Sequence, residues 1–356
     1  KPDRRQRQMC IRDSLRALAE LGFMGLNVSS DYGGTEAGVV AFSLAITEVA
    51  RACASTAVTM SVTNMVGEVI QAIASDEQKQ MYLPKLCSGE YSAGSFCLSE
   101  ACAGSDPASM LTQAIRDGDD WVLNGEKMWI SSAEYAGLFV VWAVTDKKAP
   151  KGKGISCFLV EAGTPGLIIG KAEEKMGQKA SSTNSVTFDN CRIPSHALMG
   201  KLNDGFRIAV GELAGGRIGI GSLALGVGLA AIDYARSYIV EREQFGTKIA
   251  ALQGPQWIMA DAYTQLEASR LLLMNASYLK QSGQAFSKAA SMAKVHATET
   301  ANKVCYDALQ LMGGLGYSKE CPLERYSRDV RVTSIYEGTS EIQRVIIARE
   351  LLREIQ

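Results

Sequence analysis

The stretch "SIYEGTSEIQR" (334–344) carries one carboxylate, Glu337, between a tyrosine and a glycine. Gly338 permits a backbone turn that residues with a side chain resist, so we expect Glu337 to lie on a tight loop. Burial against Ile335, Tyr336 and a ligand would raise the pKa of this carboxyl and suit it to act as a general base. An acid beside a helix start is also common without any catalytic role, and the spacing alone leaves both interpretations open.

A helix is predicted to begin immediately after this loop. Ser340 is a good N-cap residue, and Gln343 follows three residues later, which is the spacing of a capping box. The apolar helical pattern then continues to about Arg353. The positive end of this helix would favour a negative charge on Glu337.

Other side chains that could do chemistry are few. The chain has two histidines, His196 and His296, and a Ser-His-Asp or Cys-His mechanism would need one of them. His196 follows "RIPS", a predicted turn, and His296 lies in the helical run "SMAKVHATETANKV", so we expect structural or surface roles. The nine cysteines show no CxxC or zinc spacing, which indicates a reducing compartment and no metal site. A catalytic base, if there is one, is therefore expected to be a carboxylate.

Two glycine motifs, "GIGSLA" (219–224) and "GVGLAA" (226–231), fit the pattern G-x-G-x-x-A. A dinucleotide-binding fingerprint needs a strand before the glycines and a helix that opens on them. Both motifs lie inside a helical pattern instead. We therefore expect the small residues to let two helices approach closely, and we expect no nicotinamide site.

Two further stretches could bind a ligand. "FCLSEACAGSD" (96–106) has a β-like start followed by an irregular segment, whose backbone N–H groups and hydroxyls could hold a polar ring edge or a phosphate. "KMWIS" (127–131) offers Trp129 as an aromatic wall. A strand followed by an ordinary loop, and a tryptophan in the core, are the alternatives that these residues leave open.

The charge balance excludes a broad basic surface. Lys and Arg number 37, Asp and Glu number 38, and the formal net charge is -1, so no nucleic acid partner is expected. No uninterrupted apolar run reaches the ~20 residues of a membrane span, and no membrane partner is expected. The Arg-rich start lacks the apolar core of a secretory signal, and we expect it to be a frayed, solvated terminus.

The periodicity of apolar residues divides the chain into three segments. We expect a helical N-terminal domain (1–92), a middle antiparallel β domain (93–200) and a C-terminal bundle of long amphipathic helices of the four-helix type (201–356). In the first, Ser75 and Gln78 have the spacing of a capping box. In the second, Asn124-Gly125 is the signature of a two-residue hairpin turn. The predicted fold class is therefore α+β, mainly α.

Taken together, the motifs resemble those of the acyl-CoA dehydrogenase family of flavoproteins. The stretches "LSEACAGSD", "NGEKMWIS", "GRIGIG", "EREQFG", "QLMGGLGY" and "IYEGTSEIQR" occur in the order typical of the family, and the resemblance runs from about Leu15 to the C-terminus. It is closest to the short-chain and short branched-chain members. The resemblance implies the same order of domains, FAD as cofactor and a homotetramer.

The resemblance also implies roles for individual residues near the substrate. Glu337 matches the base of the family, and its backbone N–H would bind the thioester oxygen together with a hydroxyl of FAD. Arg217 matches an arginine near the base and the substrate. Tyr336 and Gly338 would line the acyl and thioester region, and Ser105 would lie near the CoA.

The remaining matches concern FAD, and they fall into four groups. The matched residues are, along the flavin ring, Phe96, Leu98, Ser99, Gly104 and Ser105; over the flavin and at its N5 edge, Trp129, Ile130 and Ser131; toward the FAD of a neighbouring subunit, Arg242, Phe245 and Gln253; and at the adenosine and phosphates, Gln310, Gly314, Thr339 and Glu341.

The sequence also departs from the family pattern. Ala101 stands where members usually have proline, and Ala214 stands where many have an aspartate beside the CoA, so one loop and one substrate contact are expected to differ. Some members place the base at a position near Gly216, which has no side chain to act, so the arrangement with Glu337 is favoured.

The activity implied by the resemblance is the α,β-dehydrogenation of short or branched-short acyl-CoA to trans-2-enoyl-CoA. It belongs to fatty-acid β-oxidation or branched amino-acid catabolism. Electrons would pass from FAD to an electron-transfer flavoprotein, in the bacterial cytoplasm or the mitochondrial matrix. An acyl-CoA oxidase-like flavoenzyme and a non-catalytic, dehydrogenase-like binding protein are the alternatives.

Overall fold

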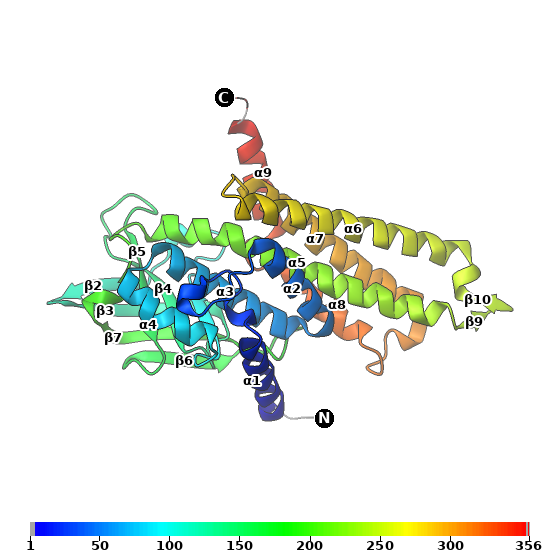
Figure 1. The fold of residues 1–356 in the computed structure, drawn as a ribbon, viewed down its shortest axis with the longest axis horizontal. Helices are drawn as coiled ribbons and strands as arrows, with labels where there is room; N and C mark the ends of the chain where they lie inside the picture. The colour runs from blue at the N-terminus through cyan, green and yellow to red at the C-terminus, as the bar shows by residue number, and fades with distance from the viewer. Residues whose placement is uncertain (1–3, 354, 356) are drawn as a thin grey trace. The chain divides into compact units, whose positions relative to one another are not determined.

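The structure of the protein, a computed structural model, describes the backbone of residues 4–353 and 355. The chain order is helices, then strands, then helices (Figure 1), which confirms the predicted fold class. The chain divides into two compact units, each built from three separate stretches. The first comprises residues up to 38, 59–174 and 180–213, and the second comprises 39–58, 175–179 and 214 onward. The predicted domain boundaries at 92/93 and 200/201 stay predictions.

Helices of the first unit precede its strands in the chain. They are α1 (Arg4–Glu20), α4 (Asp76–Cys87) and most of α3 (Ala54–Ile73). Ser75 caps α4 with a complete capping box, in which Ser75 Oγ accepts from the Gln78 N–H and the Gln78 side chain accepts from the Ser75 N–H, as predicted. The frayed start expected from the Arg-rich segment is wrong from Arg4 onward, because α1 begins there; residues 1–3 lie outside the described residues.

A single sheet forms the centre of the first unit. Its strand order is β6-β7-β3-β2-β4-β5-β8, with β1 added beside β4. Most neighbours are antiparallel, while β1 and β2 both pair with β4 in parallel. The strands are β1 (Gly94–Cys97), β2 (Gln113–Asp117), β3 (Asp120–Ser131), β4 (Leu138–Val144), β5 (Ile155–Glu161), β6 (Leu167–Ala172), β7 (Thr183–Ile193) and β8 (Leu198–Met199).

The hairpin turn predicted at Asn124-Gly125 is wrong, because β3 runs through both residues. The turn between β2 and β3 lies instead at Gly118-Asp119, between the paired residues Asp117 and Asp120. Gly125 marks a shift in the pairing of β3 with β7. A Cβ on Gly125 would come within 2.6 Å of the Cα of Thr112, so the glycine serves a close approach of two backbones and not a turn.

Strand β4 is buried on both faces, which explains its continuous apolar run. Alternate residues enter two different apolar clusters: Leu138, Val140 and Trp142 pack with residues of α3 and α4, and Phe139 and Val141 pack on the opposite face of the sheet. Trp142 is fully buried, and its indole N–H donates to the Gly205 carbonyl at 2.7 Å. In Figure 1 this unit is the region where the strands lie beside α3 and α4.

Long helices build the second unit, as the C-terminal periodicity predicted. Helix α7 contacts α6, α8 and α9, and α6 also contacts α2; α6 and α7 lie side by side in Figure 1. A short hairpin, β9–β10, connects α5 to α6. The elements are α2 (Val39–Ala52), α5 (Gly205–Ile239, which the unit contains from Ala214), β9 (Glu243–Gln244), β10 (Thr247–Lys248), α6 (Gln253–Gln281), α7 (Ser287–Leu311), α8 (Leu323–Arg331) and α9 (Ser340–Arg353).

Both glycine motifs lie inside α5, as expected for a packing role. A Cβ on Gly221 would come within 2.7 Å of Leu273 on α6, and a Cβ on Gly226 would come within 2.2 Å of the Thr47 carbonyl on α2. The small residues therefore let neighbouring helices approach α5 closely. By length and composition α5 is also apolar enough to cross a membrane, but 78% of its most apolar window is buried within the protein, which is typical of a core helix.

Candidate active site

Glu337 lies on a tight turn between the 3-10 turn Val332–Ser334 and helix α9. Its φ is 55° and that of the following Gly338 is 84°, so two consecutive residues have left-handed backbone. A glutamate in this region costs free energy of about 1–3 kcal/mol, and such a conformation persists only where surrounding groups impose it. The neighbours of this turn therefore decide where the carboxylate lies.

Two buried side chains hold this turn through its carbonyl oxygens. Gln343 donates from Nε2 to the carbonyls of Gly338 (2.9 Å) and Glu337 (3.2 Å). Lys294, on α7, donates from Nζ to the Gly338 carbonyl at 2.8 Å. Gln343 and Lys294 are both 0% exposed, so the turn is fixed from the helix that follows it and from a helix distant in the chain.

The predicted capping arrangement of α9 is wrong by one residue. Thr339 caps the helix, since its Oγ1 accepts from the Ile342 N–H at 3.3 Å. Ser340 is already in the first turn, buried, with an Oγ that has no partner among the described residues. Gln343 bonds the two turn carbonyls instead of closing a capping box, because the left-handed turn brings those carbonyls within reach of its amide.

The carboxylate of Glu337 lies in a buried, cationic environment. Its Oε1 is buried and has no hydrogen-bond partner among the described residues. Burial raises the pKa of Glu337 to about 7, against the opposing effect of the Arg217 guanidinium and the Lys294 ammonium. A carboxyl with this pKa can take up and release a proton near neutral pH, which a general base requires.

Both cations are themselves poorly compensated. Arg217, on α5, is 5% exposed; its Nη1 has long bonds to Ser287 Oγ (3.5 Å) and Ser291 Oγ (3.4 Å), and its Nε has no partner among the described residues. Burial lowers the pKa of Arg217, and it lowers that of Lys294 to about 8. Two buried cations lie near one carboxyl, and this excess of positive charge favours its ionised form.

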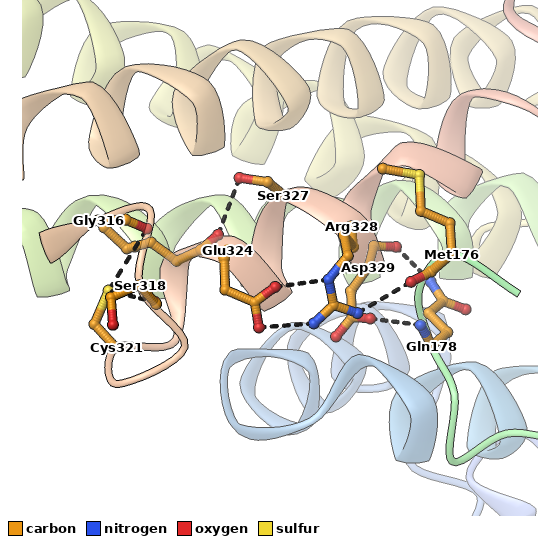
Figure 2. Close-up of polar contacts among 10 residues, drawn as sticks. Met176, Gln178, Gly316, Ser318, Cys321, Glu324, Ser327, Arg328 and Asp329 are labelled. Carbon is orange, nitrogen blue, oxygen red and sulfur yellow. Dashed lines mark hydrogen bonds and ion pairs between the residues drawn. The ribbon is translucent and has the colours of Figure 1, made fainter. Parts of the chain in front are cut away.

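Tyr336, the residue before Glu337, is anchored through its hydroxyl. The Gln178 side chain donates to the Tyr336 hydroxyl at 3.1 Å and to the Asp329 carbonyl at 3.0 Å, and the Gln178 backbone N–H donates to Asp329 Oδ1. Figure 2 shows Gln178 facing Asp329 from the loop segment that contains Met176. Burial raises the pKa of Asp329. The aromatic side of the turn is thus held by residues of the segment 175–179 and α8.

Arg328 holds the same segment one residue earlier on α8. Its Nη1 donates to the Met176 carbonyl at 3.0 Å, while Nε and Nη2 bind both carboxylate oxygens of Glu324 at 2.7 and 2.8 Å (Figure 2). A bidentate pair fixes the plane of the guanidinium. Two successive residues of α8, Arg328 and Asp329, therefore both bind the segment 175–179. These bonds leave the segment little freedom to move relative to α8.

In the first unit, a buried ion pair ties together the two stretches that resemble flavin-binding segments. Lys127 donates from Nζ to Glu100 Oε1 at 2.8 Å and to the Leu98 carbonyl at 3.1 Å. The backbone adds a bond from the Met128 N–H to the Ser99 carbonyl at 2.9 Å. The stretch that follows β1 is therefore fixed against β3 at residues 98–100 and 127–128.

Trp129 is displayed on strained backbone and is not a core residue. Its φ is 64°, and its side chain is 58% exposed, although Ile130 beside it is buried. The pairing of β3 with β7 shifts between Lys127 and Ile130, so Trp129 lies in an irregularity of the strand. Ser95 Oγ donates to the Ser131 carbonyl at 2.8 Å and so holds β3 on the C-terminal side of Trp129. The alternative of a tryptophan in the core is excluded, and the indole is free to contact a ligand.

Comparison with known families identifies the scaffold. Three family models match in chain order: acyl-CoA dehydrogenase N-terminal domain at residues 2–90, middle domain at 95–191 and C-terminal domain at 203–352. The chain belongs to the acyl-CoA dehydrogenase family. It is an oxidoreductase of this family, whose members are flavoproteins of fatty-acid and branched-chain metabolism and typically tetramers.

Individual relatives agree over nearly the whole chain. The short/branched chain specific acyl-CoA dehydrogenase of Bos taurus mitochondria is 45% identical over 94% of this chain and 77% of that protein. The solved butyryl-CoA dehydrogenase of Megasphaera elsdenii has a TM-score of 0.93 and 37% identity, over 95% of this chain and 89% of that one. A chain in a structure of the electron transferring flavoprotein of Acidaminococcus fermentans has a TM-score of 0.94 and 40% identity, over 96% and 90%.

The residues matched to the acyl-CoA dehydrogenase pattern fall into separate groups in the structure. Glu337, Arg217, Tyr336 and Gly338 lie together in the second unit. The first unit contains the stretch from Phe96 to Ser105 and the stretch from Trp129 to Ser131. The other matched residues belong to the second unit, and all but Thr339 are exposed; they are Arg242, Phe245, Gln253, Gln310, Gly314, Thr339 and Glu341.

Two observations on this chain fit a flavin nucleotide of the kind that the family carries. The indole of Trp129 is held exposed on a strained backbone, which gives an aromatic surface for a ring system. In the first turn of α9, the buried Ser340 Oγ lacks a partner among the described residues, and backbone N–H groups at a helix start suit phosphates. Each feature, taken within its own unit, therefore fits one part of such a group.

Sequence reasoning missed the lysines that hold these stretches. Lys294 and Lys127 were assigned no role, yet both are 0% exposed and bind a backbone carbonyl of a candidate ligand-binding segment. A signal for Lys294 was present: it stands at helical spacing from Ala290, Ala297 and Ala301, which all lie on the buried face of α7. A lysine on such a face calls for a partner.

Proposed function

We propose that the protein catalyses the FAD-dependent α,β-dehydrogenation of short or branched-short acyl-CoA to trans-2-enoyl-CoA, with Glu337 as the base. The observation that carries this proposal is the carboxylate of Glu337, buried on a strained turn with Oε1 unpartnered and a pKa of about 7. In the described part of the chain no group forms a hydrogen bond to this oxygen, which leaves it available for a substrate proton.

The charges around Glu337 support proton abstraction from carbon. The α-proton of a thioester is too weakly acidic for a carboxylate in water, so the site must strengthen the base and stabilise the developing negative charge. Burial strengthens the base by raising its pKa, while Arg217 and Lys294 keep a fraction of it ionised near neutral pH. The Glu337 N–H would donate to the thioester oxygen, and Tyr336 and Gly338 would line the acyl group.

FAD supplies what side chains cannot, since it would accept the β-hydrogen as a hydride. We assign the flavin ring to the side chain of Trp129 and the backbone of residues 98–99 and 131, which the Lys127 interactions and Ser95 hold in place. The start of α9, at Thr339 and Glu341, would face the phosphates. Ser105, with an exposed side chain, would contact the CoA.

The substrate class rests on relatives and not on a measured pocket. The compared proteins are named for short, branched or butyryl chains, which supports a short acyl group here. Ala214, where many members have an aspartate, is 6% exposed, and its methyl group cannot replace a carboxylate contact to the CoA. We therefore expect this chain to bind CoA without that contact.

A homotetramer and an electron-transfer flavoprotein partner complete the proposal. Phe245 is 96% exposed on positive φ at the tip of the β9–β10 hairpin, which suits a residue that reaches a neighbouring subunit. The similarity to a chain in an electron transferring flavoprotein structure supports the electron acceptor. Relatives include mitochondrial proteins, and we propose the bacterial cytoplasm or the mitochondrial matrix as the location.

The test uses the flavin as its own reporter. Purified protein should be yellow, and anaerobic addition of C4 to C8 and branched acyl-CoAs should bleach it fastest with a short chain. Glu337→Gln should keep flavin and acyl-CoA binding and lose bleaching. Full bleaching of the variant would exclude Glu337 as the base, turnover with O2 alone would favour an oxidase, and colourless protein that takes up no flavin would favour a binding protein.

A further inference from the structure

The Gly338 carbonyl accepts from two side-chain donors that differ in charge. The Gln343 amide donates at 2.9 Å from α9, and the Lys294 ammonium donates at 2.8 Å from α7. A carbonyl oxygen is already satisfied by one good donor. Burying an ammonium costs far more free energy than burying an amide. The hydrogen bond alone therefore does not account for a charged group at this place.

We propose that Lys294 is a positioning residue for the base: its ammonium fixes the Glu337-Gly338 turn through the Gly338 carbonyl and, by its charge, keeps the Glu337 carboxylate ionised. The assignment rests on the proposed function, because only a reaction that begins with proton abstraction needs this carboxylate ionised in a buried place. Lys294 does not touch the reacting atoms in this proposal. It acts through Glu337.

The charges around Glu337 include Lys294 as well as Arg217. Burial favours the protonated acid, and among the described residues Arg217 and, to a smaller extent, Lys294 oppose it. The carboxylates near Lys294 other than Glu337 are exposed and act on the lysine, raising its pKa. The charged or titratable groups packed around this turn are Arg217 on α5, Lys294 and Glu299 on α7, Asp329 on α8, Tyr336 on the turn, and Glu341 and Arg349 on α9.

Two single substitutions separate the effect of the Lys294 charge from the effect of a hydrogen bond to the Gly338 carbonyl. Lys294→Met removes the ammonium and its bond, and leaves the Gly338 carbonyl with Gln343. Gln343→Met is the matched control, since it removes the other donor to the same carbonyl and changes no charge. Both variants should fold, because one donor to the carbonyl remains in each, and far-ultraviolet circular dichroism would check this.

The readout is the titration of the Glu337 carboxyl without substrate. The C=O band of the protonated acid is followed by infrared spectroscopy across pH, and the same titration of Glu337→Gln is subtracted. The wild-type midpoint should lie near 7. In Lys294→Met it should rise by about 1 pH unit, because an opposite charge that lowers the pKa of Glu337 is lost. In Gln343→Met it should stay at the wild-type position.

Flavin reduction by substrate provides the second readout. The acid limb of the rate profile should move to higher pH in Lys294→Met by the same shift, while Gln343→Met should lower the rate at every pH without moving the limb. An unmoved infrared midpoint in Lys294→Met would overturn the proposal. If Lys294→Met does not fold, Lys294→Gln replaces it, with the same expected shift. Bleaching of Glu337→Gln would instead overturn the proposed function, and the infrared result would still stand.

Discussion

The ammonium of Lys127 lies 2.8 Å from Oε1 of Glu100, and both side chains are in the interior of the first unit, 0% and 4% exposed. Glu100 also accepts from the backbone N–H groups of Leu111 (2.6 Å) and Thr112 (3.0 Å). Burial raises the pKa of Glu100, but Lys127 and these donors outweigh it and hold the pKa below its usual value. One ion pair thus joins β3, the stretch after β1 and the start of β2.

Removing one partner of this pair should be costly. Lys127→Met leaves a buried carboxylate without its cation and the Leu98 carbonyl without its donor, and it should lower the free energy of unfolding by about 3–5 kcal/mol. The double variant Lys127→Met/Glu100→Gln should recover part of the loss. Arg192→Met, in an exposed pair with Asp117, is the control and should cost less than about 1 kcal/mol. Urea unfolding measures all three; equal losses in the buried and exposed pairs would contradict the expectation.

Ionisation of Glu337 should oppose folding in a defined pH range. Its pKa is raised from 4.5 to about 7 in the folded protein, so the stabilisation from its protonated form is fully present below about 4.5 and is lost as pH rises through 7. Glu337→Gln carries no ionisable group and should gain stability relative to wild type by up to about 3 kcal/mol between pH 5 and pH 8. Denaturant unfolding at both pH values measures this, and a difference that does not depend on pH would refute it.

Gly338 should not tolerate a side chain. Its φ is 84°, and a Cβ would come within 2.7 Å of Gln343 Nε2. Gly338→Ala should therefore destabilise by about 1–3 kcal/mol, from left-handed strain and from displacement of the amide. Gly313→Ala is the matched control, because its φ is 59° but a Cβ there meets no other atom within 4 Å. Thermal unfolding should show a larger loss of stability in Gly338→Ala than in Gly313→Ala. Equal losses would mean that the Gln343 side chain moves away from the new methyl group at no cost in free energy.

Trp129 should matter for flavin retention and not for folding. Trp129→Gly removes an indole that is 58% exposed and relieves a φ of 64°, so the flavin-free variant should be as stable as wild type within about 0.5 kcal/mol, or more stable. Flavin should dissociate from it more readily on dialysis. Trp257→Ala is the control: Trp257, on α6, is 64% exposed, and the variant should retain flavin. Loss of flavin from both variants would argue against a specific role for Trp129.

Local sequence signals predicted those elements whose formation depends on neighbouring residues. Apolar periodicity located the long helices and the order helical, β, helical, and Ser75 with Gln78 predicted a real capping box because both partners lie within one helical turn. The small residues of α5 were assigned a packing role from their helical setting, which Gly221 and Gly226 confirm.

The same signals failed where a backbone contact or a turn conformation outside the sequence pattern decided the outcome. Asn124-Gly125 reads as a hairpin turn, yet Gly125 lies within a strand because Thr112 approaches its backbone. The Ser340 cap was displaced by one residue because Gln343 bonds to carbonyls of the preceding turn. In the first case the close approach of a neighbouring backbone, and in the second the left-handed turn before the helix, outweighed a local preference of about 1 kcal/mol.

The sequence by itself determined the motif order, the isolated glutamate beside a glycine, and the absence of a histidine or metal pattern that could replace it. Those features depend on residue type and spacing, which are local. Only the tertiary structure decided that the carboxyl oxygen Oε1 of Glu337 is buried, that the pKa of this carboxyl is about 7, and that Lys294, 43 positions earlier in the sequence, bonds to its turn. Burial and close opposite charge are properties of chain segments brought together by packing, and no spacing along one segment encodes them.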